Sequence, residues 1–422
     1  MKKKSVAVVI ITNGPGELST WVRPVVDNLN KINDSFLENE RLEFSLRLVL
    51  VPCPNATGKE FEVANSWNKF ELITESKNFW KLLIKPSSFT DWPKKGLVIF
   101  LGGDQFWSIL LAKRLGYLNI TYAEWISRWP MWTNTIAAMN GKVKHLMPKK
   151  YRYKCQIIGD LMADIQLESK INFKNIEKKY IALLPGSKKA KLSVGIPFFL
   201  EMADHIAEKN NNINFIIPIA PTTNKNEYLY FQSEKNPMSV YYSSKIKRIK
   251  NLKNSIFDHV IETSKNTKIY LLKKHPCYEI LKQCDLAITT VGANTAELAG
   301  IALPMIVVLP TQHLNVMTAW DGFFGIIGRI SCINKFLTLF IKYWHLKTKK
   351  FFSWPNIKAK KLVVPERIGN ITPKQIAKEA LFLISNKKQL HKIKENLLNQ
   401  RGEEGAVKKL AYIILNSIQK LS

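Results

Sequence analysis

The stretch Tyr180-Ile181-Ala182-Leu183-Leu184-Pro185-Gly186-Ser187-Lys188 decides the fold, because an apolar run stops at Pro-Gly-Ser and an amphipathic stretch follows to about Lys209. This order predicts a buried strand of a parallel sheet that turns directly into a helix. Free backbone N–H groups, the Ser187 hydroxyl and the helix dipole would attract an anion at this corner, and Lys188 adds positive charge. A diphosphate needs this chemistry, although a plain strand–turn–helix with Ser187 as N-cap remains open.

A second corner of the same kind follows a predicted strand at Leu286–Thr290. A helix is expected from Thr295, which would be its N-cap. Glu297 falls in the first turn of that helix, where the dipole favours a carboxylate. Alternatively, Glu297 accepts hydrogen bonds from the two ribose hydroxyls of a nucleotide while the turn holds the phosphates. The turn itself consists of the small residues Gly292, Ala293 and Asn294.

Short apolar runs alternate with helical stretches through both halves of the chain. This alternation indicates doubly wound parallel sheets, so the expected fold class is α/β, with two Rossmann-like lobes and a cleft between them. Ligands of such sheets bind beyond the carboxyl ends of the strands. The predicted strands are Val6–Thr12, Phe44–Val51, Leu97–Leu101, Asn119–Tyr122 and Gln156–Ile158, then Tyr180–Leu184, Asn214–Ile219, Ile269–Leu272, Leu286–Thr290 and Met305–Leu309.

The length of 422 residues fits two lobes. We expect an acceptor-side lobe at 1–165, a nucleotide-sugar-binding lobe at 166–385 and C-terminal helices at 386–422, which could pack back on the first lobe. Helical spacing at 373–398 and 404–420 supports the last assignment. A polar stretch at 222–268, rich in Lys and Asn, is expected to be a hairpin or a mobile insertion.

The formal net charge of +30 predicts an anionic partner, namely nucleic acid, lipid headgroups or a phosphorylated substrate. A bias in the genome's nucleotide composition is an alternative source of the lysines. The lysines are dispersed and match no RNA- or DNA-binding motif, so nucleic acid is not the expected partner. The five cysteines are scattered, which suits free thiols in a reducing cytoplasm. The histidines show no metal-ligand spacing, and neither a metal nor a cofactor is expected.

Several motifs together resemble the lipid-A-disaccharide synthase family, glycosyltransferase family 19. The resemblance implies a GT-B-like fold and an inverting, metal-independent transfer of an acylated glucosamine from UDP onto an acylated glucosamine phosphate. UDP-sugar would be the co-substrate. The motifs are Leu184–Lys188, Asp285–Leu298 with Pro304–Val307, Ile158-Gly159-Asp160-Leu161-Met162-Ala163-Asp164, Leu101-Gly102-Gly103-Asp104 and Trp354-Pro355-Asn356-Ile357.

The resemblance also implies roles for single residues. Asp104 would match the family's general base; without the family it is equally a turn residue that caps the helix Gln105–Leu115. Lys188 would match an arginine that contacts the diphosphate, keeping the charge but losing the bidentate fork. Asn356 would lie near the donor, or else form a local turn. Gly186, Ser187 and Glu297 complete the expected donor site together with the 292–295 turn.

The opening turn departs from the family pattern. Gly16, Glu17 and Ser19 remain as an acceptor-side loop in an altered register, but the family's Gly-Asp pair is absent. We therefore expect a lipid-linked or glycolipid acceptor of unknown identity, and a donor sugar of the N-acetylglucosamine or acylated glucosamine type. Two alternatives remain: a nucleotide-sugar 2-epimerase-like isomerase, and a non-catalytic binding protein on the same fold.

A basic amphipathic stretch at 332–347 combines Phe336, Phe340 and Trp344 with lysines. Such a segment can lie in a headgroup interface, although an ordinary helix between the lobes is the alternative. No apolar run reaches the about 18 residues that span a bilayer. The expected location is the cytoplasm, peripheral on the inner face of the membrane. A loop carrying Trp125, Trp129 and Trp132 could face carbohydrate or lipid, or serve as core and rim packing.

Overall fold

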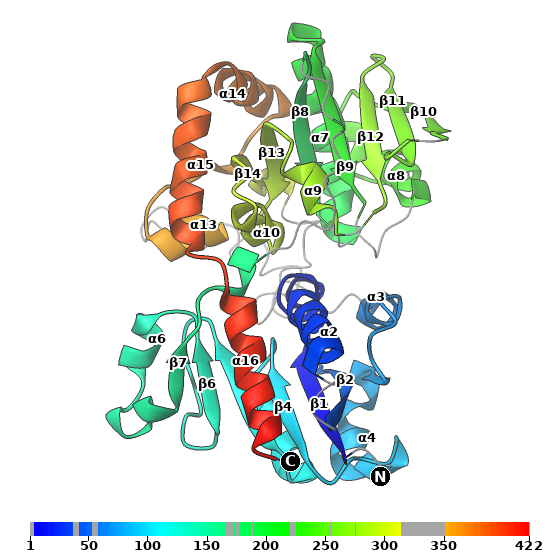
Figure 1. Ribbon diagram of the computed structural model, residues 1–422. Helices are drawn as coiled ribbons and strands as arrows, with labels where there is room; N and C mark the ends of the chain where they lie inside the picture. Colours follow the sequence, from blue (N-terminus) through cyan, green and yellow to red (C-terminus); the bar gives the residue numbers. More distant parts are fainter. Residues whose placement is uncertain are drawn as a thin grey trace, which may run out of the picture. The chain divides into compact units, whose positions relative to one another are not determined.

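The computed structural model describes residues 4–36, 42–52, 58–164, 173, 177–186, 189–219, 225–233, 235–253, 255–274, 276–313 and 351–421. The chain divides into two compact units, each built around its own sheet (Figure 1). The first unit comprises Met1–Gln166 together with Gly402–Ser422, and the second comprises Leu167–Arg401. Among the described residues no helix is long and apolar enough to cross a membrane.

The sheet of the first unit has seven strands in the order β3-β2-β1-β4-β5-β6-β7, and all its neighbouring pairs are parallel. Its central strands β1 and β4 are buried on both faces, which explains their continuous apolar sequences. The strands are β1 (Lys4–Thr12), β2 (Leu42–Leu50), β3 (Leu72–Thr74), β4 (Gly96–Phe100), β5 (Leu118–Ala123), β6 (Thr135–Ala138) and β7 (Cys155–Ile157).

Helices cover both faces of this sheet. Alternate residues of β1 belong to different core clusters: Val8 packs with α2 and α16, whereas Val9 packs with α4 and α5. The helical elements are α1 (Pro15–Glu17), η1 (Leu18–Val22), α2 (Arg23–Phe36), α3 (Glu60–Asn65), η2 (Ser76–Asn78), α4 (Phe79–Ile84), η3 (Pro86–Ser88), α5 (Gln105–Leu115), α6 (Gly141–Leu146), η4 (Lys149–Lys154), η5 (Leu161–Asp164) and α16 (Ala406–Gln419).

The sheet of the second unit has eight strands in the order β10-β11-β12-β9-β8-β13-β14-β15. Its pairs are parallel except at one edge, where β10–β11 and β11–β12 are antiparallel. The strands are β8 (Lys179–Leu184), β9 (Ile213–Pro218), β10 (Ile246–Asn251), β11 (His259–Thr263), β12 (Lys268–Leu272), β13 (Leu286–Thr290), β14 (Met305–Pro310) and β15 (Glu366–Gly369).

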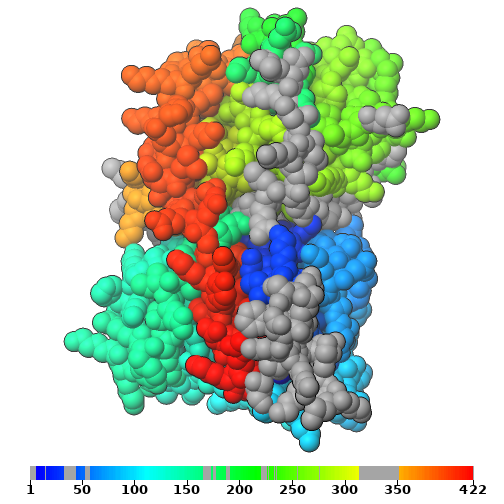
Figure 2. All heavy atoms as spheres, in the orientation of Figure 1, coloured from blue at the N-terminus to red at the C-terminus, as the bar shows by residue number. Residues whose placement is uncertain are grey.

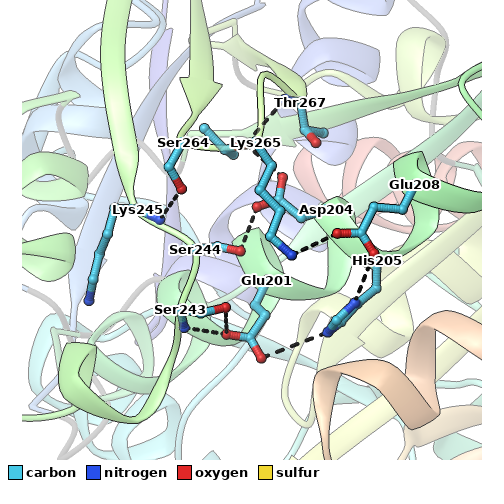
Figure 3. A network of polar contacts seen from close by, with 11 residues as sticks. Glu201, Asp204, His205, Glu208, Ser243, Ser244, Lys245, Ser264, Lys265 and Thr267 are labelled. Carbon is cyan, nitrogen blue, oxygen red and sulfur yellow. Dashed lines mark hydrogen bonds and ion pairs between the residues drawn. The ribbon is translucent and has the colours of Figure 1, made fainter.

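The antiparallel edge comes from the stretch expected to be a hairpin or a mobile insertion, and the hairpin is confirmed for β10 and β11. It is anchored on α7 (Lys189–Lys209) through Asp204, which is fully buried (Figure 3). Asp204 accepts hydrogen bonds from Thr263 Oγ1 at 2.6 Å and from Ser244 Oγ at 2.5 Å. The described part of this stretch also forms α8 (Lys225–Gln232) and η6 (Ser239–Tyr241).

The C-terminal helices belong to different units, so the expected range 386–422 is divided. α15 (Lys387–Arg401) contacts α10 (Asn294–Gly300), α13 (Trp354–Ala359) and α14 (Pro373–Ser385) of the second unit. α16 instead packs on α2, β4 and η5 of the first unit, and its residues (red) lie beside the blue N-terminal segment in Figure 2. Helical spacing alone cannot tell which sheet an amphipathic helix covers. The second unit also contains α9 (Tyr278–Leu281) and η7 (Thr311–His313).

Candidate active site

The first corner of the second unit lies where β8 ends and α7 begins. Gly186 has φ +108°, a conformation that favours glycine, and a Cβ atom there would lie 2.9 Å from Lys191 Cβ. Gly195 of α7 permits the helix to approach the corner, because a Cβ atom on it would lie 2.7 Å from the Pro185 carbonyl oxygen. Ser187 and Lys188, which the sequence places in the donor site, lie outside the described residues.

The second corner lies between β13 and α10. Gly292 has φ +153°, and both Gly292 and Ala293 are exposed, so the backbone of this turn is accessible to a ligand. α10 begins at Asn294, one residue earlier than expected, and Thr295 is not its N-cap. The Thr295 hydroxyl is buried and donates to the Gly292 carbonyl oxygen at 2.9 Å, which fixes the turn from inside.

The two corners lie side by side, because β8 and β13 are parallel neighbours with Leu184 opposite Thr289. Lys191 connects them: its Nζ donates to the Val291 carbonyl oxygen at 3.1 Å and lies 3.4 Å from the position of a Cβ atom on Gly292. The structure therefore brings Gly186 and the 291–294 turn together around an ammonium group. The sequence analysis did not single out Lys191, although its place in the first turn of the predicted helix was a usable signal.

Glu297 lies in the first turn of α10, as expected, and is half-buried. Burial raises the pKa of the Cys277 thiol, and the negative charge of Glu297 raises it further. The three described cysteines, Cys155, Cys277 and Cys284, are buried and form no disulfide with one another.

Asn356 holds a loop together from inside and is fully buried. Its Nδ2 donates to Val364 O at 2.9 Å and to Glu366 Oε1 at 2.8 Å, and its Oδ1 accepts from the backbone N–H groups of Val363 and Val364. This geometry is that of the local-turn alternative for the Asn356 side chain. Its loop nevertheless adjoins the second corner, because the Trp354 N–H donates to Thr295 Oγ1 at 3.1 Å.

In the first unit Asp104 is the N-cap of α5. Its Oδ1 accepts from the Phe106 N–H at 2.9 Å, and its Oδ2 pairs with Arg128 Nη1 at 3.4 Å. The side chain is still 46% exposed, so a ligand can reach the carboxylate. The capping alternative is thus realised, and it leaves room for a second role. Gln105 ties Arg128 to this corner, since its Oε1 accepts from the Arg128 N–H at 2.8 Å.

Gly16, Glu17 and Ser19, expected in an acceptor-side loop, lie instead in the helical elements α1 and η1, beside the Asp104 turn. The Glu17 side chain lies against two glycines: a Cβ atom on Gly102 would lie 3.0 Å from Glu17 Cβ, and one on Gly14 would lie 2.6 Å from Glu17 Oε2. Burial raises the pKa of the Glu17 carboxyl, and this outweighs a backbone hydrogen bond that lowers it. The Gly16 carbonyl accepts from Thr20 Oγ1, and Ser19 is buried. Of the three expected acceptor-side residues, Glu17 is therefore the one with a side chain beside Asp104's turn.

Aromatic side chains cover the surface next to Asp104. Trp129 and Trp132 are stacked with ring centroids 5.3 Å apart, and Phe106 lies 5.8 Å from Trp129. Lys113 lies 5.3 Å from the centroid of the Trp132 ring. The exposed residues of this surface are the aromatic Phe106, Trp125 and Trp132 and the aliphatic Ile126 and Met131, and we call it the aromatic surface. The tryptophan loop is therefore not simply core packing.

The Gly159–Asp164 motif has a structural role in the first unit. Asp164 accepts hydrogen bonds from the backbone N–H groups of Gly405 and Val407, both at 2.5 Å, at the start of α16. Gly159 has φ +107°, and a Cβ atom on it would lie 3.2 Å from Ala406 Cβ. The motif therefore anchors the C-terminal helix. The stretch 332–347, expected to contact a membrane, lies outside the described residues. Among the residues that the structure describes, no group of three or more His, Cys, Asp or Glu could hold a metal ion.

Comparison with solved structures defines the class of fold. The UDP-GlcNAc 2-epimerase from Methanocaldococcus jannaschii aligns with 98% of this chain and 99% of its own, with a TM-score of 0.53 and 12% identity. The UDP-GlcNAc 2-epimerase from Neisseria meningitidis, bound to UDP-GlcNAc, aligns with 98% of this chain and 100% of its own, with a TM-score of 0.51 and 12% identity. The fold is GT-B-like α/β.

Sequence comparison identifies distant relatives of this chain. Lipid-A-disaccharide synthase from Persephonella marina is 25% identical over 246 residues, which cover 56% of this chain and 50% of that protein. The synthase of Wigglesworthia glossinidia brevipalpis is 25% identical over 253 residues, 58% of this chain and 52% of that protein. The chain spans about half the length of these relatives, and no family model matches. It is a distant relative of the lipid-A-disaccharide synthases.

Proposed function

We propose that this protein is an inverting glycosyltransferase that moves a sugar from a UDP-sugar to a lipid-linked or glycolipid acceptor. The observation that carries the proposal is the convergence of the Gly186 and Gly292 corners around Lys191 in the second unit. Exposed backbone at a pair of strand–helix corners with a cation between them matches the needs of a diphosphate. The distant relationship to lipid-A-disaccharide synthases supports the same reaction class.

The donor would bind through its diphosphate and its ribose. The backbone of Gly186, Ser187 and the 292–295 turn, together with Lys188, would hold the phosphates, and Glu297 would accept hydrogen bonds from the ribose hydroxyls. These fixed dipoles and charges would stabilise the departing UDP without a metal. A sugar of the N-acetylglucosamine or acylated glucosamine type is the proposed donor group.

Asp104 is the proposed general base. Its accessible carboxylate would accept the proton of the acceptor hydroxyl while the hydroxyl oxygen attacks the anomeric carbon. The bond from that carbon to the diphosphate oxygen breaks, its electron pair leaves with UDP, and attack from the opposite side inverts the configuration. Glu17, next to the Asp104 turn, lies on the proposed acceptor side.

The acceptor is proposed to be lipid-linked because the aromatic surface beside Asp104 is exposed and carries Arg128 and Lys113 at its edge. Aromatic rings with adjacent cations suit the boundary between headgroups and acyl chains. The net charge of +30 would add attraction to anionic lipids. We therefore place the protein in the cytoplasm, peripheral on the inner face of the membrane, with 332–347 as a further contact.

A 2-epimerase is the second candidate, because two of the solved structures with this fold are UDP-GlcNAc 2-epimerases. Incubation with UDP-GlcNAc alone separates the two functions, since an epimerase forms an epimer without an acceptor. A transferase leaves the donor sugar unchanged until an acceptor is added.

Titration calorimetry with UDP and with UDP-GlcNAc tests the proposal at its first step. We expect saturable binding of one nucleotide per chain, with the same affinity in the presence of EDTA. A protein that binds neither compound is not a UDP-sugar transferase. Binding without any transfer to extracted membrane lipids would instead support the non-catalytic binding protein.

A further inference from the structure

Lys191 occupies the space that two glycines leave open. Its Cβ lies 2.9 Å from the position of a Cβ atom on Gly186, and its Nζ lies 3.4 Å from the corresponding position on Gly292. A side chain at either glycine would collide with or crowd Lys191. Glycine at both positions therefore leaves room for the Lys191 side chain. Its ammonium group donates to the Val291 carbonyl oxygen at 3.1 Å.

Thr290 adds a second polar group to the same place. It is the last residue of β13 and is 5% exposed, and its Oγ1 has no hydrogen-bond partner among the described residues. That oxygen lies 3.5 Å from the position of a Cβ atom on Gly186. A buried hydroxyl without a hydrogen-bond partner is unfavourable, so a ligand oxygen that accepts its hydrogen bond would be bound favourably.

We propose that Lys191 and Thr290 bind the diphosphate of the donor, Lys191 by charge and Thr290 by a hydrogen bond from its hydroxyl. This inference rests on the proposed function for the identity of the donor, and it assigns the main cation to Lys191 rather than to Lys188. In the free protein the Lys191 ammonium donates to a neutral carbonyl. An ionised phosphate oxygen is a stronger acceptor, so the ammonium moves from Val291 O to the phosphate when the nucleotide binds.

Lys191→Met and Thr290→Val test the inference, with Lys209→Met as the matched control. Lys209 is exposed at the other end of α7, so its loss removes the same charge from the same helix. We expect calorimetry to show at least a tenfold loss of UDP affinity for Lys191→Met and a severalfold loss for Thr290→Val. Lys209→Met should bind UDP within twofold of the unaltered protein. Circular dichroism checks that each variant is folded.

The outcomes separate this inference from the proposed function. If Lys191→Met and Thr290→Val both bind UDP within twofold of the unaltered protein, or if Lys209→Met loses as much affinity as Lys191→Met, the inference is wrong and the UDP site stands. If the unaltered protein binds inorganic pyrophosphate but not UDP, and Lys191→Met loses that binding, the inference holds and the UDP-sugar function does not. Should Lys191→Met fail to fold, Thr290→Val decides alone.

Discussion

Asp104 and Glu17 belong to the same corner of the first unit, after β4 and after β1, and have different surroundings. Asp104 is half-exposed and contacts a backbone N–H and the Arg128 guanidinium, whereas Glu17 is packed over Gly14 and against Gly102. Desolvation raises the pKa of Glu17. Environments that treat two carboxyl groups differently are common at sites of proton transfer, and this contrast makes the corner the part of the first unit best suited to chemistry.

Asp104→Asn should remove transfer activity and spare nucleotide binding. We expect a loss of at least about 100-fold in kcat, because the amide cannot take up the acceptor's proton. Asparagine is as good an N-cap as aspartate, so α5 should stay intact. Activity assays and UDP calorimetry measure the two effects, and Asp91→Asn, at an exposed aspartate, is the control. A variant that keeps more than a tenth of the activity would contradict the role of Asp104 as base.

Glu17→Gln should stabilise the protein at neutral pH. The folded-state pKa of Glu17 is raised, so its protonated form adds stability below the usual carboxyl pKa, and that stability is lost as the pH rises through the folded value. At pH 7 the buried charge is a cost that glutamine removes. We expect a higher Tm for the variant at pH 7 and no difference near pH 4. Glu62→Gln, at an exposed site, is the control. An equal Tm difference at both pH values would refute the assignment.

At the scale of elements, α7 serves both the candidate site and the sheet edge. Its first turn carries Lys191 at the corner after β8, and its middle carries Asp204, which binds the hairpin of β10 and β11 (Figure 3). Beside Asp204, Glu208 forms an ion pair with Lys265 at 2.7 Å on the exposed side of the helix. The same helix therefore links the position of the β8–α7 corner to that of the sheet edge.

Asp204→Ala should lower the free energy of unfolding of the second unit by about 2–4 kcal/mol, because it leaves the hydroxyls of Thr263 and Ser244 buried without their acceptor. Glu208→Ala removes a half-exposed ion pair instead and should cost less than about 1 kcal/mol. Urea denaturation measures both variants. Equal losses would mean that Asp204 is no special anchor of the hairpin.

At the scale of the whole molecule, the first unit is assembled from both ends of the chain. α16 places Val407, Leu410, Ala411, Ile414 and Ile418 in the core cluster that contains Val8 and Val25. Asp164 fixes its start through two backbone N–H groups. The helical layer on one face of the first sheet is therefore completed by residues that follow the second unit in the chain.

Ending the chain after Arg401 should unfold the first unit and leave the second intact. Each buried Leu or Ile of α16 contributes about 1.5–3 kcal/mol, and together they approach the about 5–15 kcal/mol of a whole domain. Hydrogen exchange should show unprotected amides in β1 and β4, while UDP calorimetry reports on the second unit. Protected β1 and β4 amides in the shortened protein would contradict this.

A single substitution at Asp164 tests the cap of α16 while the helix stays in the chain. Asp164→Ala removes the acceptor for the Gly405 and Val407 N–H groups and should cost about 1–2 kcal/mol. Asp164→Asn retains one acceptor oxygen and should lose less. Urea denaturation of the two variants, compared with the shortened chain, separates the cap from the apolar packing.

Most strands could be predicted from the sequence because burial on both faces demands an unbroken apolar run. Tyr180–Leu184 and Leu286–Thr290 are confirmed within one residue of β8 and β13, and each ends at the predicted turn. Short or partly exposed strands gave no such signal: β6 (Thr135–Ala138) and β15 (Glu366–Gly369) were missed, and the residues of β15 are not fully buried. The burial of the Asn356 side chain within its own loop could not be predicted, because sequence does not reveal which amides are buried.

The sequence by itself determined the two parallel sheets and the two glycine corners, since local apolar periodicity and φ-permissive residues act over short stretches. Only the tertiary structure decided that Lys191 lies between the corners, that Arg128 meets Asp104 and that α16 belongs to the first unit. Those contacts join residues from different elements, up to the two ends of the chain. They depend on how the elements pack, and side-chain packing across such separations leaves no periodic trace in the sequence.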